Sequence, residues 1–147
     1  ICAGMKSINV EGATGNIHTN YDGKAKAAID FLRNEGNFVF LHVEAPDECG
    51  HRFEVENKVR AIELIDSKKM GPILDYPNSQ GDLKVMGLPD HPTPLCLRTH
   101  THDAVPFLIY DSRDVKNDNN LTYDEENAKL TGLYVEKGHM LLKQFLE

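Results

Sequence analysis

Two almost uninterrupted apolar runs limit the folds that this chain can adopt. The first is FVFLHV at residues 38–43, and the second is VPFLIYD at residues 105–111. Runs of this length, rich in β-branched and aromatic residues, are typical of strands that are buried on both faces of a parallel sheet. Residues 83–88 carry a third, weaker strand pattern and residues 6–10 a fourth. The chain is therefore predicted to build a mostly parallel sheet.

Helical patterns separate the predicted strands. Residues 23–36 carry apolar residues on one helical face, and we expect Asp22 to cap the start of this helix and Gly36 to end it. Residues 54–74 repeat apolar residues at helical spacing. Near the end of this second helix, Gly71-Pro72 is expected to kink or interrupt it, because proline removes a backbone donor.

The last third of the chain continues the same order. Residues 112–127 are polar and predict a surface loop or a short cap, and Val135 to Leu146 predicts a last helix. Strands that alternate with helices indicate an α/β fold in which helices flank the sheet. No internal repeat and no clear boundary divides the 147 residues, so we expect them to belong to one domain.

Composition excludes two classes of partner. The formal net charge is −7 and no basic run is present, which argues against a nucleic-acid surface. No apolar stretch reaches the roughly 18 to 20 residues that a membrane span needs. The first residues lack the pattern of a signal peptide, and three widely spaced cysteines without a CxxC pair are typical of reduced thiols. We therefore expect a cytoplasmic protein.

Carboxylate and imidazole groups stand in three segments beside the predicted strands. The five groups are Asp47 and His51 after the first apolar run, Asp90 and His91 after the weaker strand, and His100 before the second apolar run. Ligands of open α/β sheets bind at the carboxyl edge of the strands, where two of these segments leave the sheet. This mixture of oxygen and nitrogen donors suits zinc or manganese, and magnesium less well. Five groups exceed the needs of one tetrahedral ion, but they do not complete two coordination spheres.

Each of these signals also has an ordinary structural explanation. An isolated Asp-x-x-x-His is common by chance, and Asp90-His91 stands before two prolines, where a turn is typical. His100 fits a polar residue near the start of a strand. Cys49 has no base partner in the sequence, so we interpret it as a small packing residue. The residues alone leave a metal site and ordinary loops both open.

Four segments resemble one enzyme family over nearly the whole chain. They are GATGNIHTNYDGKAKAA, HVEAPDECGHRFEVENKVRAIELID, LPDHPTPLCLRTHTHDAVPFLIYD and YDEENAKLTGLYVEKGH. The motif types DxxxGH, DH and HT-x-[DN]-x-VP, in this order, resemble those of the archaeal-type cofactor-independent phosphoglycerate mutases of the alkaline phosphatase superfamily. The resemblance implies that residues 1–147 are the C-terminal portion of an alkaline-phosphatase-like domain whose N-terminal part is absent.

The resemblance also implies a ligand set for two divalent ions, with manganese, zinc and magnesium as candidates. Carried over by motif, Asp47, His51 and His100 are ligands of one ion, and Asp90 and His91 are ligands of the other. His100 is chosen over the nearby His102 because the family histidine stands six residues before the proline of VP. The family's nucleophilic serine and one further aspartate ligand have no counterpart in these residues.

The implied reaction interconverts 3-phosphoglycerate and 2-phosphoglycerate through a phosphoserine, as a step of glycolysis. The partners are a small phosphorylated substrate and the N-terminal part of the same enzyme, and we expect this chain alone to be inactive. The alternatives are another phosphotransferase or phosphohydrolase of the superfamily, such as a proposed homoserine kinase, and a non-catalytic relic domain. Homo-oligomerisation stays open. The substrate-binding residues also stay open: Arg98 and Lys24 are basic candidates, but a solvated surface role fits each of them equally well.

Overall fold

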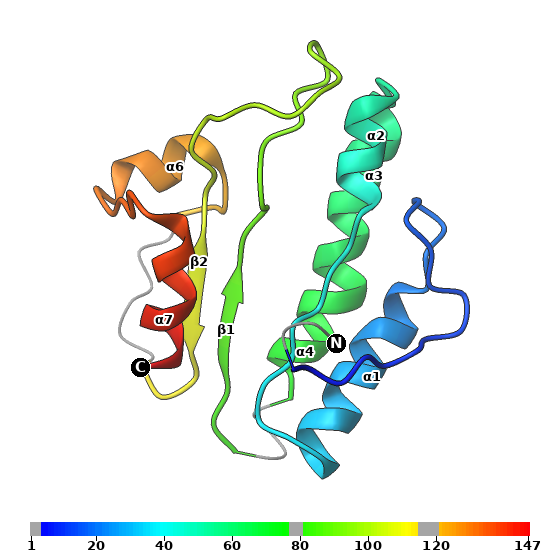
Figure 1. Ribbon diagram of the computed structural model, residues 1–147, viewed down its shortest axis with the longest axis vertical. Coiled ribbons are helices and arrows are strands. Elements are labelled where there is room, and N and C mark those ends of the chain that lie inside the picture. Colours follow the sequence, from blue (N-terminus) through cyan, green and yellow to red (C-terminus); the bar gives the residue numbers. More distant parts are fainter. Residues whose placement is uncertain (1–3, 77–80, 115–120) are drawn as a thin grey trace. The chain divides into compact units, whose positions relative to one another are not determined.

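The computed structural model describes residues 4–76, 81–114 and 121–147 (Figure 1). The chain divides into two compact units, which are described separately. Unit 1 comprises residues 1–81 and 93–100, and unit 2 comprises residues 82–92 and 101–147. None of the helices in the described ranges combines the length and the apolar character that a bilayer crossing requires.

The first helix of unit 1, α1 (Tyr21–Asn34), begins at a side-chain cap. Asn20 Oδ1 accepts a hydrogen bond from the backbone N–H of Gly23 (2.8 Å), so the prediction that Asp22 caps this helix is wrong. Asp22 lies in the first turn instead, where its charge complements the helix dipole. The N–H of Gly36 donates to the carbonyl of Phe31 (3.1 Å), so the helix ends close to the predicted position.

The apolar run at residues 38–43 does not form the predicted strand. These residues carry no strand pairing, and the large side chain of Phe40 is 70% exposed. A strand needs a hydrogen-bonding neighbour, and no described segment pairs with this run. The weaker prediction at residues 6–10 fails for the same reason.

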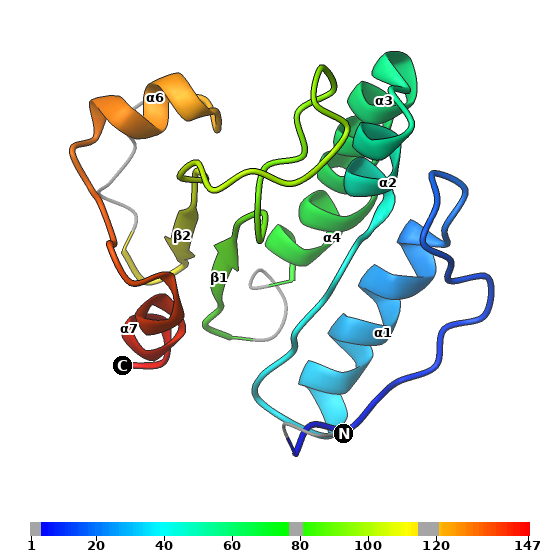
Figure 2. The same cartoon turned by 45° about the horizontal axis from the view of Figure 1, so that its top comes forward.

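The segment after this run is a helix and not a loop. Helix α2 (Ala45–His51) has Pro46 in its first turn, where the missing N–H of proline is tolerated. Proline therefore begins a helix directly after the apolar run. Helix α3 (Val55–Ile65) follows after a tight turn and packs against α2 (Figure 2).

The long helical pattern of residues 54–74 is interrupted near its end, as predicted. After α3, a π-helical turn (Asp66–Met70) precedes the short helix α4 (Gly71–Leu74). Pro72 lies in the first turn of α4, so the wide turn comes directly before the proline that disturbs regular helical hydrogen bonding. Cys49 of α2 is fully buried, which confirms its interpretation as a packing residue.

Unit 2 contains the only strand pairing of the described residues. Strands β1 (Lys84–Gly87) and β2 (Leu108–Asp111) run antiparallel, with Lys84 opposite Asp111 (Figure 1). Helices together with a small sheet confirm the α/β class. The predicted parallel arrangement, however, is replaced by antiparallel pairing in this part of the chain. Residues 88–107 contain no crossover helix of the kind that joins neighbouring parallel strands.

The C-terminal part of unit 2 is helical in short pieces. Helix α6 (Glu125–Leu130) begins at the capping residue Asp124 and lies partly in the segment predicted to be a loop or cap. A 3-10 turn (Gly138–Met140) leads into α7 (Leu141–Leu146). The last predicted helix is therefore confirmed only in its C-terminal half.

Candidate metal centre

Helix α2 places two of the predicted ligands on one face. Asp47 and His51 are four residues apart, which is about one helical turn, so their side chains are neighbours on the surface of the helix. His51 Nε2 lies 3.2 Å from Asp47 Oδ2. The i, i+4 spacing that stands out in the sequence therefore becomes a direct contact because this segment is helical.

The third predicted ligand of this group comes from a distant segment of unit 1. His100 Nε2 lies 3.0 Å from His51 Nε2 and 3.3 Å from Asp47 Oδ1. The two imidazole rings are tilted by 52°, with 4.9 Å between their centroids. One carboxylate and two imidazole side chains, those of Asp47, His51 and His100, therefore lie close together.

The tautomer of neutral His51 follows from its other nitrogen. Nδ1 lies 2.9 Å from the carbonyl oxygen of Arg98, which can only accept a hydrogen bond. Nδ1 therefore carries the proton, and the lone pair of Nε2 points toward Asp47 and His100. That lone pair can accept a hydrogen bond from the ring N–H of His100, and it can also bind a metal ion.

Asp47 is also held by a hydrogen bond from Thr93, on the same carboxylate oxygen that lies near His100. The hydroxyl of Thr93 donates a hydrogen bond to Asp47 Oδ1, and Thr93 itself is buried. This contact orients the carboxylate while leaving its other oxygen beside His51. Thr93 stands between two prolines in the sequence, and no pattern there distinguishes it from an ordinary loop residue.

The remaining two predicted ligands are neighbours in unit 2. Asp90 and His91 follow β1, and His91 Nε2 lies 3.3 Å from Asp90 Oδ2. The other carboxylate oxygen, Oδ1, accepts a hydrogen bond from the backbone N–H of His91 (3.1 Å). This local turn agrees with the ordinary explanation of the Asp-His pair, and it also brings an oxygen and a nitrogen donor side by side.

The donor chemistry of both groups fits a divalent ion. Two imidazoles and one carboxylate are a set that zinc uses at catalytic sites, where a fourth position stays open for water or substrate. Manganese accepts the same mixture of nitrogen and oxygen. In the second group, a carboxylate and an imidazole offer two of the ligands that such an ion needs.

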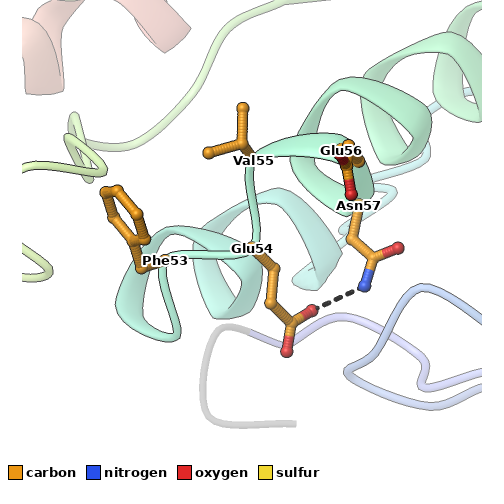
Figure 3. Close-up of a pocket in the computed structure, with 5 residues that line it drawn as sticks. All are labelled: Phe53, Glu54, Val55, Glu56 and Asn57. Atoms are coloured by element: carbon orange, nitrogen blue, oxygen red, sulfur yellow. Dashed lines mark hydrogen bonds between the residues drawn. The ribbon is translucent and has the colours of Figure 1, made fainter.

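A shallow pocket in the turn between α2 and α3 is a separate feature. It is lined by residues 53–57, and none of the five predicted ligands borders it (Figure 3). The side-chain amide of Asn57 donates to Glu54 Oε2 (2.9 Å), and this hydrogen bond lowers the pKa of Glu54. The predicted site is therefore defined by converging ligand atoms and not by this hollow.

Known proteins are similar to this chain in sequence and in fold. A Methanosarcina mazei protein named 2,3-bisphosphoglycerate-independent phosphoglycerate mutase is 48% identical over 130 residues, which are 88% of this chain and 32% of that protein. A Methanosarcina barkeri protein of the same name is 43% identical over 143 residues, 97% of this chain and 36% of that protein. The chain thus spans about a third of the length of these relatives.

The chain also matches a solved structure and a family model. The structure of a Pyrococcus horikoshii protein matches with a TM-score of 0.83 and 33% sequence identity, covering 97% of this chain and 42% of that one. The names of the relatives confirm the resemblance to cofactor-independent phosphoglycerate mutases. Because the Metalloenzyme superfamily model matches residues 2–141, the chain belongs to the Metalloenzyme superfamily.

Proposed function

We propose that this chain is the metal-binding part of a cofactor-independent phosphoglycerate mutase, an isomerase that interconverts 3-phosphoglycerate and 2-phosphoglycerate. The observation that supports this most directly is the convergence of Asp47, His51 and His100 on one point. The names of the relatives support the choice of reaction. The reaction belongs to glycolysis, and on that account we assign the protein to the cytoplasm.

In this proposal Asp47, His51 and His100 hold one divalent ion, and Asp90 and His91 take part in holding a second. Manganese, zinc and magnesium are the candidates. When bound, the ions offset the charge on the phosphoryl oxygens and lower the pKa of the attacking hydroxyl. The local positive charge also explains how a chain with a net charge of −7 serves a strongly anionic substrate.

The residues of this chain bind and orient, and none of them is assigned as the acid, base or nucleophile. Helix α2 sets the spacing of Asp47 and His51. The hydroxyl of Thr93 orients the carboxylate of Asp47, and the carbonyl of Arg98 holds the proton of His51 on Nδ1. The serine that accepts the phosphoryl group and a further aspartate ligand are assigned to a segment outside these 147 residues. We therefore expect this chain alone to bind metal without turnover.

Phosphorus NMR tests the proposal on the protein as its gene encodes it. The protein is loaded with manganese and given 3-phosphoglycerate without any bisphosphoglycerate. The expected result is the appearance of the 2-phosphoglycerate signal, and its loss in the His100→Ala variant. An unchanged spectrum from metal-loaded protein would favour another phosphotransferase or phosphohydrolase of the superfamily. Failure of the wild-type protein to retain any divalent ion would favour a relic domain.

A further inference from the structure

We infer that Lys58 is a positioning residue for the metal centre, acting through Thr93 on the Asp47 carboxylate. The inference rests on the proposed function, because it assigns a role toward the ion that Asp47 is proposed to hold. Lys58 belongs to α3 and contacts none of the five predicted ligands in the described hydrogen bonds and ion pairs. Its effect must therefore pass through the residue that it touches.

Thr93 connects Lys58 to Asp47 through its two ends. Lys58 Nζ donates to the backbone carbonyl of Thr93 at 2.6 Å, a short, charge-assisted hydrogen bond. The side-chain hydroxyl of the same threonine donates to Asp47 Oδ1. Thr93 is 5% exposed, and both bonds are partly buried. A single buried residue thus links α3 to the carboxylate on α2.

Gly50 provides the space that this link requires. A Cβ atom at Gly50 would lie 2.7 Å from the carbonyl oxygen of Thr93 and 2.9 Å from Lys58 Nζ. The first of these contacts is with backbone, which cannot swing away as the end of a side chain can. Gly50 lies within α2 between Asp47 and His51, so the absence of a side chain lets the residue 93–100 segment approach the ligand-bearing helix.

The chemistry of the contact argues for positioning and against a general surface role. Among the described residues Lys58 forms no ion pair, whereas Arg52, six residues earlier, pairs with Glu54. The ammonium group is directed at a neutral carbonyl close to a proposed cation site. Coulomb repulsion alone would make such a charge unfavourable for metal binding. The placement of Lys58 is explained if holding Thr93 and Asp47 in position favours metal binding more than the repulsion between the ammonium group and the ion opposes it.

The sign of one measurement separates these two effects. If Lys58 acts only by its charge, Lys58→Met removes a repulsion and manganese binds more tightly. If Lys58 positions Thr93, the same variant weakens manganese binding, by about tenfold as is typical for loss of an outer-shell partner. Titration of the full gene product with manganese gives this dissociation constant directly. The visible absorption of the cobalt-substituted protein adds a readout of ligand geometry, and we expect it to change.

A second variant tests whether the effect passes through Thr93. Thr93→Val keeps the carbonyl and the shape of the side chain but removes the hydroxyl, and we expect a similar loss of manganese affinity. In the Thr93→Val background, Lys58→Met should then add less than it does alone, since both act through one contact. Lys58→Arg keeps a cationic hydrogen-bond donor, so this variant should retain most of the wild-type affinity for manganese. Lys26→Met, in an exposed pair with Asp30, is the matched control and should leave manganese binding unchanged.

The outcomes distinguish this inference from the proposed function. If His100→Ala loses the ion while Lys58→Met binds manganese equally well or better, the positioning role is wrong and the metal centre stands. If His100→Ala retains the ion, the proposed centre itself is wrong. Thermal unfolding identifies a Lys58→Met protein that no longer folds, and Thr93→Val then decides the question: unchanged manganese affinity in that variant overturns the role of the link.

Discussion

The two groups of predicted ligands are held by different kinds of contact. Asp47, His51 and His100 meet because a helix and a distant segment pack together, and the Asp47 side chain is 23% exposed. Asp90 and His91 are neighbours in the sequence, and the Asp90 side chain is 73% exposed. The contacts of the first group therefore depend on the tertiary packing of unit 1, whereas the contact between Asp90 and His91 depends on a local turn. The two groups should respond differently to mutation.

Removal of a ligand from each group is the strongest test of this difference. We expect Asp47→Ala and Asp90→Ala each to weaken binding of one ion by more than roughly 100-fold, beyond the usual loss from an outer-shell change. In metal-free protein only Asp47→Ala should also lower the unfolding temperature, because Thr93 then loses its acceptor in a buried position. Metal analysis and thermal unfolding measure the two effects.

Asp30→Ala is the control for this pair of variants, since Asp30 forms an exposed pair with Lys26 on α1. It should change neither the metal content nor the unfolding temperature appreciably. Equal unfolding temperatures for metal-free Asp47→Ala and Asp90→Ala would contradict the distinction between packed and local ligand groups.

A second test removes a buried charge from unit 1. Lys69 lies in the π-helical turn and is 8% exposed. Its burial, and to a smaller extent the positive charge of Lys24, lower its pKa to about 8. The unfolded chain thus binds more protons between pH 8 and about 10.5, so stability should rise with pH across this window. Below pH 8 the protein bears the full cost of burying the charged ammonium group of Lys69. In that range Lys69→Met should stabilise the protein by up to about 3 kcal/mol.

Chemical denaturation at pH 7 and pH 10 measures this effect. The wild-type protein should gain stability between the two conditions, and Lys69→Met should show little of that gain. Lys26→Met removes an exposed charge and is expected to change stability within about 0.5 kcal/mol. A Lys69→Met variant that is less stable than the wild type at pH 7 would show that the buried ammonium has a stabilising partner.

The third test disturbs the packing of the first ligand group without touching a ligand. Gly50→Ala places a methyl group 2.7 Å from the Thr93 carbonyl oxygen, so the backbone must shift, at a cost of about 1 to 3 kcal/mol. Gly71→Ala is the matched control in the same unit, because its Cβ meets only Asp66 O at an ordinary 3.7 Å. This control should be neutral or slightly stabilising, since alanine favours helices over glycine. Equal stability of the two variants, measured by urea unfolding, would show that the missing side chain of Gly50 is not needed for this packing.

These contacts explain why the sequence indicates the candidate ligands but not the residues that support them. Asp47 and His51 are recognisable because one family motif holds both in a short segment. Thr93 and Lys58 are separated by 35 residues, and Thr93 and Asp47 by 46. No local periodicity encodes such pairs, because they form only when distant segments pack. Gly50 is similar, since a glycine in a sequence does not tell which backbone approaches it.

The errors in the predicted fold have a related cause. The α/β class follows from patterns within segments, and it is confirmed. Pairing is a property of two segments, and the apolar run at residues 38–43 has no neighbour within the described part of the chain. Pro46 shows the same ambiguity at a smaller scale. Proline can end a strand, and it also suits the first turn of a helix. In this chain Pro46 lies in the first turn of α2, and α2 packs against α3.

The smallest expected effect concerns a local contact of unit 2. Asp124 caps α6: its Oδ1 accepts from the N–H of Asn127 (2.8 Å), and its Oδ2 accepts from the hydroxyl of Thr122 (2.6 Å). These hydrogen bonds, that of the Asn127 backbone first, lower the pKa of Asp124 to about 2. The cap is therefore fully effective above the ordinary value of 3.8 and is lost as the pH falls toward 2.

Asp124→Ala should lower the unfolding temperature by only a few degrees at neutral pH, because a single cap is lost. Asp124→Asn keeps a good capping side chain that does not titrate, so its α6 should no longer weaken between pH 4 and pH 2 in the way that the wild-type helix does. Amide hydrogen exchange of residues 125–130 follows this helix separately from the rest of the molecule. Since the contact is local, neither variant should alter manganese binding by Asp47, His51 and His100. Weaker manganese binding in Asp124→Ala would show that the first ligand group also depends on unit 2, and not on the packing of unit 1 alone.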